Sequence, residues 1–275
     1  MERKEITLVA TDLDGTFLNS EKEVPPFNRQ MISRLKEKGI LFGICSGRPI
    51  DTVRPMLRDW GILDSVSFIV GMNGGTLYDM RSKEKEDYHL VSGNDAIDVI
   101  HFFEDLEVEF YVLIGPVKFL NKITRETREE ADSYGAFEVE TDLESFLIDR
   151  DINKVVIWCK DEKMMPVVEQ RAKEFHHENL IGYPTGPNYF EYLDPRTNKG
   201  FGLARLAKHY GTTLDHIMAF GDAENDREML GMAGVGVCMK NGKAITKQAA
   251  DHVTALTNDE SAVGHFLEDY FFNEV

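Results

Sequence analysis

Two carboxylates stand close together in the segment Asp-Leu-Asp-Gly-Thr at residues 12–16. An ionised Asp12 can attack phosphorus and form a mixed anhydride, which water later cleaves. Because attack by a carboxylate on a phosphate dianion is repulsive, a divalent cation has to bridge the two groups, and hard oxygen ligands favour magnesium. Asp14 could hold or deliver a proton if neighbouring carboxylates raise its pKa.

Three further segments offer groups that a phosphate site needs. Ser46, in a Ser-Gly-Arg-Pro run, supplies a hydroxyl at an open helix N-terminus. Lys199 supplies a compact positive charge that could screen Asp12 from an incoming phosphate. The run Gly-Asp-Ala-Glu-Asn-Asp at 221–226 adds more acid after an apolar stretch. Each segment alone is typical of a helix cap or a surface residue, so a site requires that they meet.

Apolar runs that alternate with helical segments would position these groups. They predict a doubly wound, mostly parallel α/β sheet covered on both faces. Asp12, Ser46, Asn73 and Asp222 all follow predicted strands, and ligands of open α/β sheets bind beyond the carboxyl ends of the strands. We therefore expect them to meet at one edge of the sheet. The predicted strands are 6–11, 40–45, 67–70, 216–220 and 235–239, and the predicted helices are 27–38, 49–58, 198–209, 224–231 and 243–250.

The pattern changes in the middle of the chain, where half-polar strands accompany helices. This predicts an α+β domain at 84–194 inserted into a core made of 1–83 and 195–275. Tyr183 and Tyr192 lie in its last segment, where aromatic residues more often belong to a core than to a ligand site. The elements predicted in the insertion are strands at 109–114, 153–159 and 189–193 and a helix at 163–176.

The composition describes an acidic globular protein. Among 275 residues, 31 Lys and Arg stand against 48 Asp and Glu, a net charge of -17. This charge repels nucleic acid, and no apolar run reaches the length of a membrane span. The three cysteines lie in apolar runs, which predicts core positions and a reducing cytoplasm. We expect a cytoplasmic monomer or weak homodimer whose partner is a small phosphorylated metabolite, without nucleic acid or membrane partners.

The order of these motifs strongly resembles the haloacid dehalogenase (HAD) superfamily and, more narrowly, the Cof-type phosphatases. The resemblance covers nearly the full core, whereas the insertion matches mainly in length and position. It implies a Rossmann-like catalytic core and an α/β cap that closes over the site. The motifs that carry it are Asp12-Leu13-Asp14-Gly15-Thr16, Ser46-Gly47-Arg48-Pro49, Lys199-Gly200 and Gly221-Asp222-Ala223-Glu224-Asn225-Asp226.

The resemblance also implies a reaction and a role for each motif. The reaction is magnesium-dependent hydrolysis of small phosphate monoesters, commonly sugar phosphates, through an aspartyl-phosphate. Asp12 would be nucleophile and metal ligand, Asp14 the acid/base whose backbone carbonyl also binds magnesium, and Asp222 a further metal ligand. Asp226 would orient Lys199 or a metal-bound water. The residues that would hold phosphate are Leu13, Ser46, Gly47, Lys199 and Asn225.

Two segments depart from the family pattern and leave loop detail and substrate fit open. Relatives usually carry Asn-Ala after a late Met-Gly pair, where this chain has Lys-Asn-Gly at 240–242. The usual Asp-Gly-Val near the end is replaced by Glu-Ser-Ala-Val at 260–263.

Two other functions stay open at this point. A phosphomutase would pass the phosphoryl group to a sugar hydroxyl rather than to water. A receiver-like signalling module also uses a strand-end Asp, a Ser or Thr, a Lys and magnesium, but it needs no inserted cap. Flavin mononucleotide and pyridoxal phosphate are alternatives to sugar phosphates as substrates.

Overall fold

The computed structural model describes residues 4–273. Contacts divide the chain into two compact units, one running through Glu86 and resuming at Asn198, the other covering Asp87–Thr197. The sequence predicted boundaries at 83/84 and 194/195, and each lies three residues before the corresponding boundary in the structure.

The first unit is built on one large sheet with the strand order β16-β15-β14-β1-β2-β3-β4-β5. The strands from β16 to β3 are parallel, and β4 runs antiparallel to β3. The predicted doubly wound, mostly parallel sheet is therefore confirmed. Its strands are β1 (Leu8–Thr11), β2 (Leu41–Cys45), β3 (Phe68–Gly71), β4 (Thr76–Asp79), β5 (Lys85–Asp87), β14 (Ile217–Gly221), β15 (Val235–Cys238) and β16 (His252–Val253).

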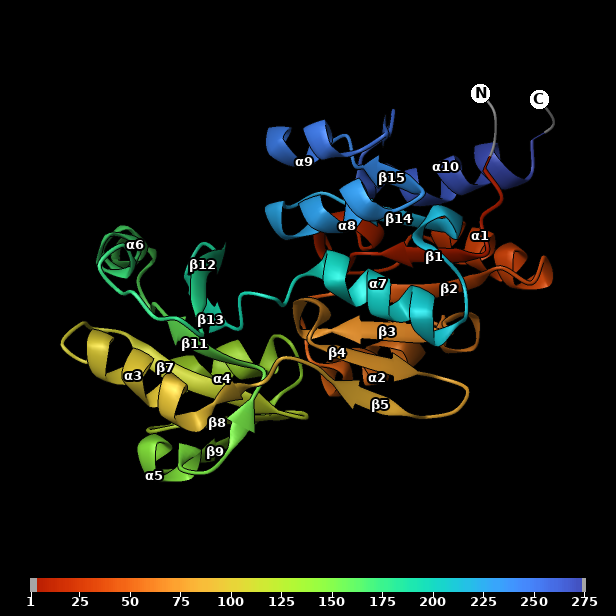
Figure 1. Ribbon diagram of the computed structural model, residues 1–275. Coiled ribbons are helices and arrows are strands. Elements are labelled where there is room, and N and C mark those ends of the chain that lie inside the picture. The colour runs from red at the N-terminus through yellow and green to blue at the C-terminus, as the bar shows by residue number, and fades with distance from the viewer. Residues whose placement is uncertain (1–3, 274–275) are drawn as a thin grey trace. The chain divides into compact units, whose positions relative to one another are not determined.

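Helices cover both faces of this sheet (Figure 1). On one face, α1 (Pro26–Glu37), α2 (Ile50–Asp59) and α10 (Ala262–Phe271) enclose a hydrophobic core with the strands. In α1, Met31, Ile32 and Leu35 form the apolar stripe that turns inward. The other face carries α7 (Lys199–His209), which packs on α8 (Arg227–Met232), and α9 (Ala244–Ala249) packs on α8 in turn. The sequence did not predict β4, β5, β16 or α10.

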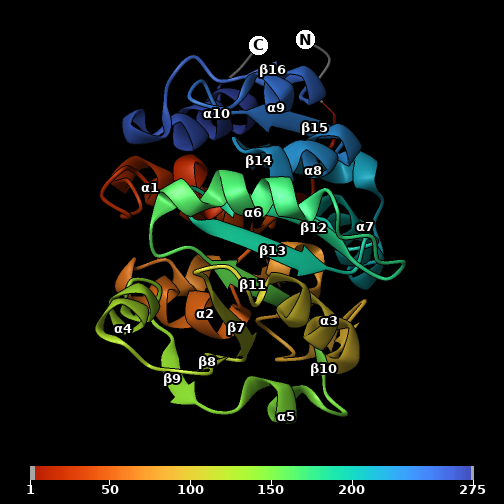
Figure 2. The same ribbon diagram turned by 90° about the vertical axis from the view of Figure 1, so that its left-hand side faces the viewer.

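The second unit is an α+β domain with its own hydrophobic core. Its six-stranded sheet has the order β12-β13-β11-β7-β8-β9. Figure 2 looks onto α3 and α6, which pack on this sheet. Tyr192 belongs to the same hydrophobic core and is 2% exposed. The elements are β6 (Val91–Ser92), α3 (Gly93–Phe103), β7 (Glu109–Ile114), β8 (Val117–Leu120), α4 (Arg125–Asp132), β9 (Phe137–Glu140), α5 (Leu143–Leu147), β10 (Asp151–Ile152), β11 (Lys154–Trp158), α6 (Met165–Ala172), β12 (Ile181–Gly186) and β13 (Tyr189–Leu193).

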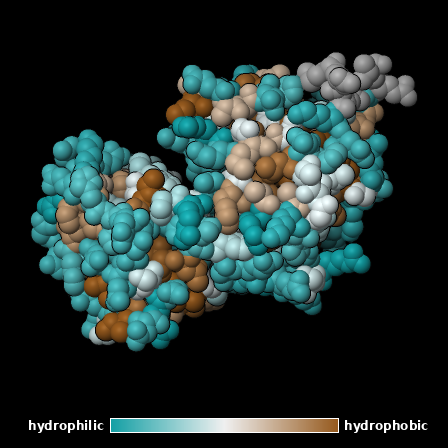
Figure 3. Space-filling model, in the orientation of Figure 1, coloured by the Kyte–Doolittle hydropathy of each residue, from teal (hydrophilic) through white to brown (hydrophobic). Residues whose placement is uncertain are grey.

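The face shown in Figure 3 is mostly hydrophilic, with small hydrophobic patches. Cys45, Cys159 and Cys238 are free and buried, so their predicted core positions are confirmed. Within residues 4–273, no helix combines the length and the apolar character that crossing a membrane requires.

Candidate active site

The chemistry-bearing residues stand at the carboxyl ends of four adjacent parallel strands. In the sheet, β14, β1, β2 and β3 are neighbours, and Asp222, Asp12 and Ser46 directly follow the first three. The backbone amide of Asp12 donates to the carbonyl of Phe220 at 2.9 Å, and that of Ser46 donates to Val70 at 2.8 Å. Each loop therefore leaves the sheet beside the next one, as expected for an α/β ligand site.

Lys199 joins two carboxylates beneath this edge. Its ammonium lies 2.6 Å from Asp12 Oδ1 and 2.6 Å from Asp226 Oδ1, and the Lys199 side chain is fully buried. Asn198 caps α7 by accepting the amide of Phe201, so Lys199 begins a well-defined helix. The helix thereby fixes the point from which the ammonium reaches Asp12.

The electrostatics of this group leave negative charge in excess. Although burial alone would lower the pKa of Lys199, Asp12 and Asp226 raise it, so the ammonium stays protonated. Burial raises the pKa of Asp12 well above its usual value, and the carboxylates of Asp226 and Asp222 add to this against the attraction of Lys199. One ammonium cannot neutralise three carboxylates, so an ionised Asp12 requires further positive charge nearby.

Asp222 is held by the turn that contains Gly15. The hydroxyl of Thr16 donates to Asp222 Oδ1 at 2.7 Å. Gly15 has a φ of +78°, and a Cβ there would lie 2.6 Å from Asp222 Oδ2. Only glycine therefore fits this left-handed position beside the carboxylate. Burial raises the pKa of Asp222 to about 6, although the bond from Thr16 opposes this.

Two of the three neighbouring carboxylates fit a divalent cation. Ligand oxygens of Asp12, Asp222 and Asp226 lie within 4.8 Å of one another. Asp226 is already committed, because Oδ1 accepts from Lys199 and Oδ2 accepts the backbone amides of Asp222 and Ala223 at 2.9 Å. Asp12 and Asp222 remain, and such a hard, anionic oxygen set suits magnesium.

The segment 46–47 lies beside two asparagines. The carbonyl of Ser46 accepts the amide of Asn73, and a Cβ on Gly47 would lie 3.0 Å from Asn73 Oδ1. Asn225 Nδ2 donates to the same Oδ1 at 3.1 Å. Asn73 thus brings together the predicted phosphate-binding residues of two motifs. The side chain of Leu13 is buried in the core, so only its backbone could reach a phosphate.

Asp14 differs from the expectation. Its carboxylate accepts from the guanidinium of Arg48 and, at 2.8 Å, from the ammonium of Lys22. Burial would raise the pKa of Asp14, but the two cations outweigh it and lower the pKa. The raised pKa expected from neighbouring carboxylates is therefore wrong for this state, because opposite charges stand closer to Asp14 than like charges do.

Several residues of the site carried no role in the sequence analysis. Arg48 and Thr16 lay inside recognised motifs, so their positions marked them as candidates. Lys22 gave no signal, since it lies in a loop outside every motif.

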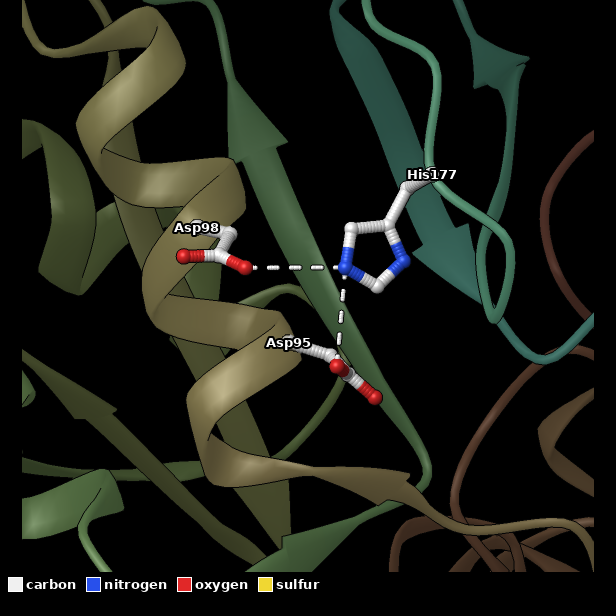
Figure 4. Close-up of side chains that lie close together, drawn as sticks. All are labelled: Asp95, Asp98 and His177. Atoms are coloured by element: carbon white, nitrogen blue, oxygen red, sulfur yellow. Dashed lines mark ion pairs between the residues drawn. The ribbon is translucent and has the colours of Figure 1, made fainter.

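A second acidic group lies in the other unit, where Asp95 and Asp98 project from α3 toward the ring of His177 (Figure 4). The Nε2 atom of His177 is 3.5 Å from a carboxylate oxygen of each Asp. The backbone amide of Asn179 donates to His177 Nδ1, so the proton of a neutral ring sits on Nε2. A metal at Nε2 would need the opposite tautomer. The group is therefore a clasp between α3 and the loop after α6, made by the contacts of His177 and by a hydrogen bond from Asn179 Nδ2 to Asp95 at 3.5 Å.

Comparison with known proteins gives consistent matches over nearly the whole chain. The family model of haloacid dehalogenase-like hydrolases matches residues 9–267. The 5-amino-6-(5-phospho-D-ribitylamino)uracil phosphatases YitU and YcsE of Bacillus subtilis are each 30% identical, covering 96% and 98% of this chain and 97% of each relative. A haloacid dehalogenase-like hydrolase structure from Bacteroides thetaiotaomicron superimposes with a TM-score of 0.86 at 27% identity, covering 97% of this chain and all of that one.

Proposed function

This chain belongs to the haloacid dehalogenase-like hydrolases and is a phosphatase, and we propose that it hydrolyses small phosphate monoesters through a phospho-Asp12 intermediate that depends on magnesium. The observation that carries this proposal is the contact of a fully buried Lys199 with both Asp12 and Asp226. A buried ammonium beside the carboxylate of Asp12 can attract a phosphate group, which Asp12 alone would repel. Membership of this family argues against the receiver-like alternative.

In the first step, a carboxylate oxygen of Asp12 attacks phosphorus and the bond from phosphorus to the leaving oxygen breaks. Lys199 stays protonated and screens the negative charge that Asp12 and the phosphoryl group bring together. Backbone and side-chain donors at Ser46, Gly47 and Asn225 would orient the phosphoryl oxygens. Asp226 does not touch the reacting atoms in this scheme; it holds Lys199 and the backbone at Asp222 in place.

Asp12, Asp222 and the backbone carbonyl of Asp14 would hold the magnesium ion. When bound, magnesium supplies positive charge that reduces the repulsion between Asp12 and the phosphoryl group. Asp12 and Asp222 both have pKa values raised by burial, so without a cation each favours its protonated form more than an exposed aspartate does.

Asp14 would transfer protons in both half-reactions. It would give a proton to the departing oxygen, and it would then take one from the water that cleaves the acyl phosphate. Since Arg48 and Lys22 hold its carboxylate in the described state, Asp14 has to leave these partners before it can carry a proton. Substrate binding would therefore include a movement of the Asp14 side chain.

The proposed substrates are phosphorylated polyhydroxy compounds, with sugar phosphates as the main class. The relatives YitU and YcsE are named for a ribityl phosphate, which belongs to this class, so 5-amino-6-(5-phospho-D-ribitylamino)uracil is the first compound to test. Flavin mononucleotide and pyridoxal phosphate should be assayed beside the sugar phosphates.

The inserted unit is proposed to choose the leaving group, while the first unit performs phosphoryl transfer. It has its own hydrophobic core and can therefore be exchanged as a unit. Replacing residues 87–197 by the corresponding part of a relative should change the order of preferred substrates. An unchanged order would place selection in the first unit instead.

The proposed function is tested by measuring phosphate release from a panel of metabolites with magnesium, with calcium and with excess chelator. We expect turnover with magnesium only, because the looser coordination of calcium misplaces the nucleophile. Asp12→Asn should abolish turnover while the variant keeps the melting temperature of the parent. Product analysis with a hexose phosphate distinguishes hydrolysis from transfer to a sugar hydroxyl, and an isomerised sugar phosphate as main product would favour the mutase. Full turnover in chelator would contradict the metal requirement.

A further inference from the structure

Three asparagine side chains hold carbonyl groups of the loop that follows Asp12. The Nδ2 of Asn241 donates to the carbonyl of Gly15 at 2.7 Å, across 226 residues of sequence. Asn258 donates to the carbonyl of Leu18 at 2.9 Å, and Asn28 donates to the carbonyl of Phe17 at 3.1 Å. Three carbonyl groups within four residues are thus fixed by side chains from distant parts of the chain.

The orientation of the Asn241 amide is set on both sides. Its Oδ1 accepts the backbone amide of Asn258 at 3.1 Å, while its Nδ2 faces the Gly15 carbonyl. Turning the amide over would place an oxygen against a carbonyl and an NH2 group against an N–H donor. The Asn241 amide therefore has a single orientation, in which its NH2 group donates to Gly15 and its oxygen accepts from Asn258.

The peptide that Asn241 holds lies between two groups of the proposed reaction. Asp14 precedes Gly15, and the hydroxyl of Thr16, which follows it, donates to the proposed metal ligand Asp222 at 2.7 Å. Gly15 has a φ of +78°, so its peptide has access to conformations that other residues rarely adopt. The hydrogen bond from Asn241 to the Gly15 carbonyl restricts the conformations that this peptide can adopt.

We infer that Asn241 is a positioning residue, which fixes the Asp14-Gly15-Thr16 turn so that Asp14 and Asp222 keep their places. This inference deepens the proposed function and rests on it. Asn241 lies between Lys240 and Gly242, the two positions of this segment that depart from the usual Met-Gly-Asn-Ala pattern, whereas the asparagine itself agrees with it.

Burial separates Asn241 from the other two asparagines. Asn28 is fully buried and Asn258 is 7% exposed, so removing either leaves unsatisfied groups inside the protein and should lower stability. Asn241 is exposed, and water can replace its hydrogen bonds. Its loss should therefore loosen the turn and leave the rest of the fold intact.

Two variants separate the donor from the acceptor of this side chain. Asn241→Ala removes both, whereas Asn241→Asp keeps the oxygen that accepts from Asn258 and loses the donor to Gly15. Asn273→Ala is the matched control, because Asn273 is also exposed and donates to Asp269 at 2.8 Å.

In kinetic measurements with a phosphate ester and saturating magnesium, both Asn241 variants should lower kcat about 3- to 10-fold. This factor corresponds to the net free energy of one neutral hydrogen bond. KM should change less than about twofold, and melting temperatures should match the parent. Asn273→Ala should behave as the parent. Losses that appear only in KM, or that follow the melting temperature, would overturn the positioning role.

Amide hydrogen exchange tests the same contact without any substrate. The amide of Leu18, which donates to Leu13 at 2.9 Å across the turn, should exchange about 3- to 10-fold faster in both Asn241 variants. Parent-like exchange and kcat in Asn241→Asp would show that Asn241 serves only to hold Asn258, which overturns the inference. If the parent proves inactive on phosphate esters, the proposed function fails, while the exchange rates still decide whether Asn241 fixes the turn.

Discussion

The guanidinium of Arg48 binds the carboxylate of Asp14 side-on, through the edge that carries Nε and Nη2: Nε lies 3.0 Å from Oδ2, and Nη2 lies 2.9 Å from each oxygen. The side chains are 21% and 39% exposed, so the pair is partly shielded from water. Such bidentate pairs are stronger and more specific than a single ion pair. In the described state, the proposed proton carrier is thus an anion held by a cation.

Removing this cation should change the pH dependence of the reaction. In Arg48→Ala the carboxyl of Asp14 loses its Coulombic attraction to the guanidinium, the strongest single effect that lowers its pKa, so it should keep its proton to higher pH. We expect the alkaline limb of the kcat/KM profile, which reports groups of the free enzyme, to move to higher pH with an alkyl phosphate. Lys22→Ala should move it less, because Lys22 is 63% exposed. An unmoved limb in Arg48→Ala would exclude Asp14 as the group that titrates.

Asp14→Asn should slow both chemical steps, but to a degree that depends on the ester. An alkyl leaving group needs its oxygen protonated, so loss of the acid should cost roughly 10²–10⁴-fold, whereas an aryl oxide leaves unaided. With p-nitrophenyl phosphate, the variant should form the acyl phosphate at a near-normal rate and hydrolyse it slowly. Rapid quench should then show a burst and a trappable phosphoenzyme. Equal slowing for both esters without accumulation would leave Asp14 a structural role.

Asp226→Asn should weaken magnesium binding. Three carboxylates against one ammonium give the site a net charge of -2, and the substitution reduces it to -1. The new amide also cannot accept from Lys199 and from two backbone amides at once without turning its NH2 group toward a donor. We expect the magnesium concentration for half-maximal activity to rise about tenfold or more and kcat to fall. A parent-like magnesium titration would show that Asp226 matters only for the fold.

Asp79→Asn, a substitution away from the proposed catalytic residues, should lower the free energy of unfolding at neutral pH. Burial would raise the pKa of Asp79, but backbone amides at 81 and 82 and the side chains of Tyr210 and His209 lower it to about 2. A carboxyl with a lowered folded pKa stabilises above the unfolded value near 4 and loses this effect as pH falls toward 2. Urea unfolding should give a loss of roughly 2 kcal/mol at pH 7 that shrinks below pH 4. A difference that is constant down to pH 3 would point to a loss of packing.

Zinc should not stabilise the second unit through His177. Because Asn179 donates to Nδ1, the Nε2 proton faces Asp95 and Asp98. To bind Nε2, zinc would have to displace this proton, and either the imidazole ring or the backbone at 177–179 would have to change its conformation. Thermal unfolding with and without zinc is expected to give the same transition in the parent and in Asp98→Asn. A zinc-dependent rise that disappears in Asp98→Asn would show that the clasp is a metal site.

The local elements were largely accessible from the sequence. Continuous apolar runs at β1, β2 and β14 and the amphipathic pattern of α1 determine strands and helices within a few residues. Because parallel strands end at a common edge, the same pattern also placed Asp12, Ser46 and Asp222 near one another. It missed β4, a short antiparallel strand after a turn in which Asn73 adopts a positive φ, since such turns have no periodicity to detect.

Only the tertiary structure decided the partners of each charged group. The sequence supplied Asp14 with neighbouring carboxylates, but packing placed Arg48 against it, 34 residues further on. Likewise, no spacing rule indicates that Asn241 reaches the carbonyl of Gly15 across 226 residues. Residue types and periodicity determine where each strand ends, and therefore which groups stand at the edge of the sheet, because both are properties of a single element. The protonation and orientation of those groups depend on contacts between elements, since the nearest charge and the nearest donor in space fix them.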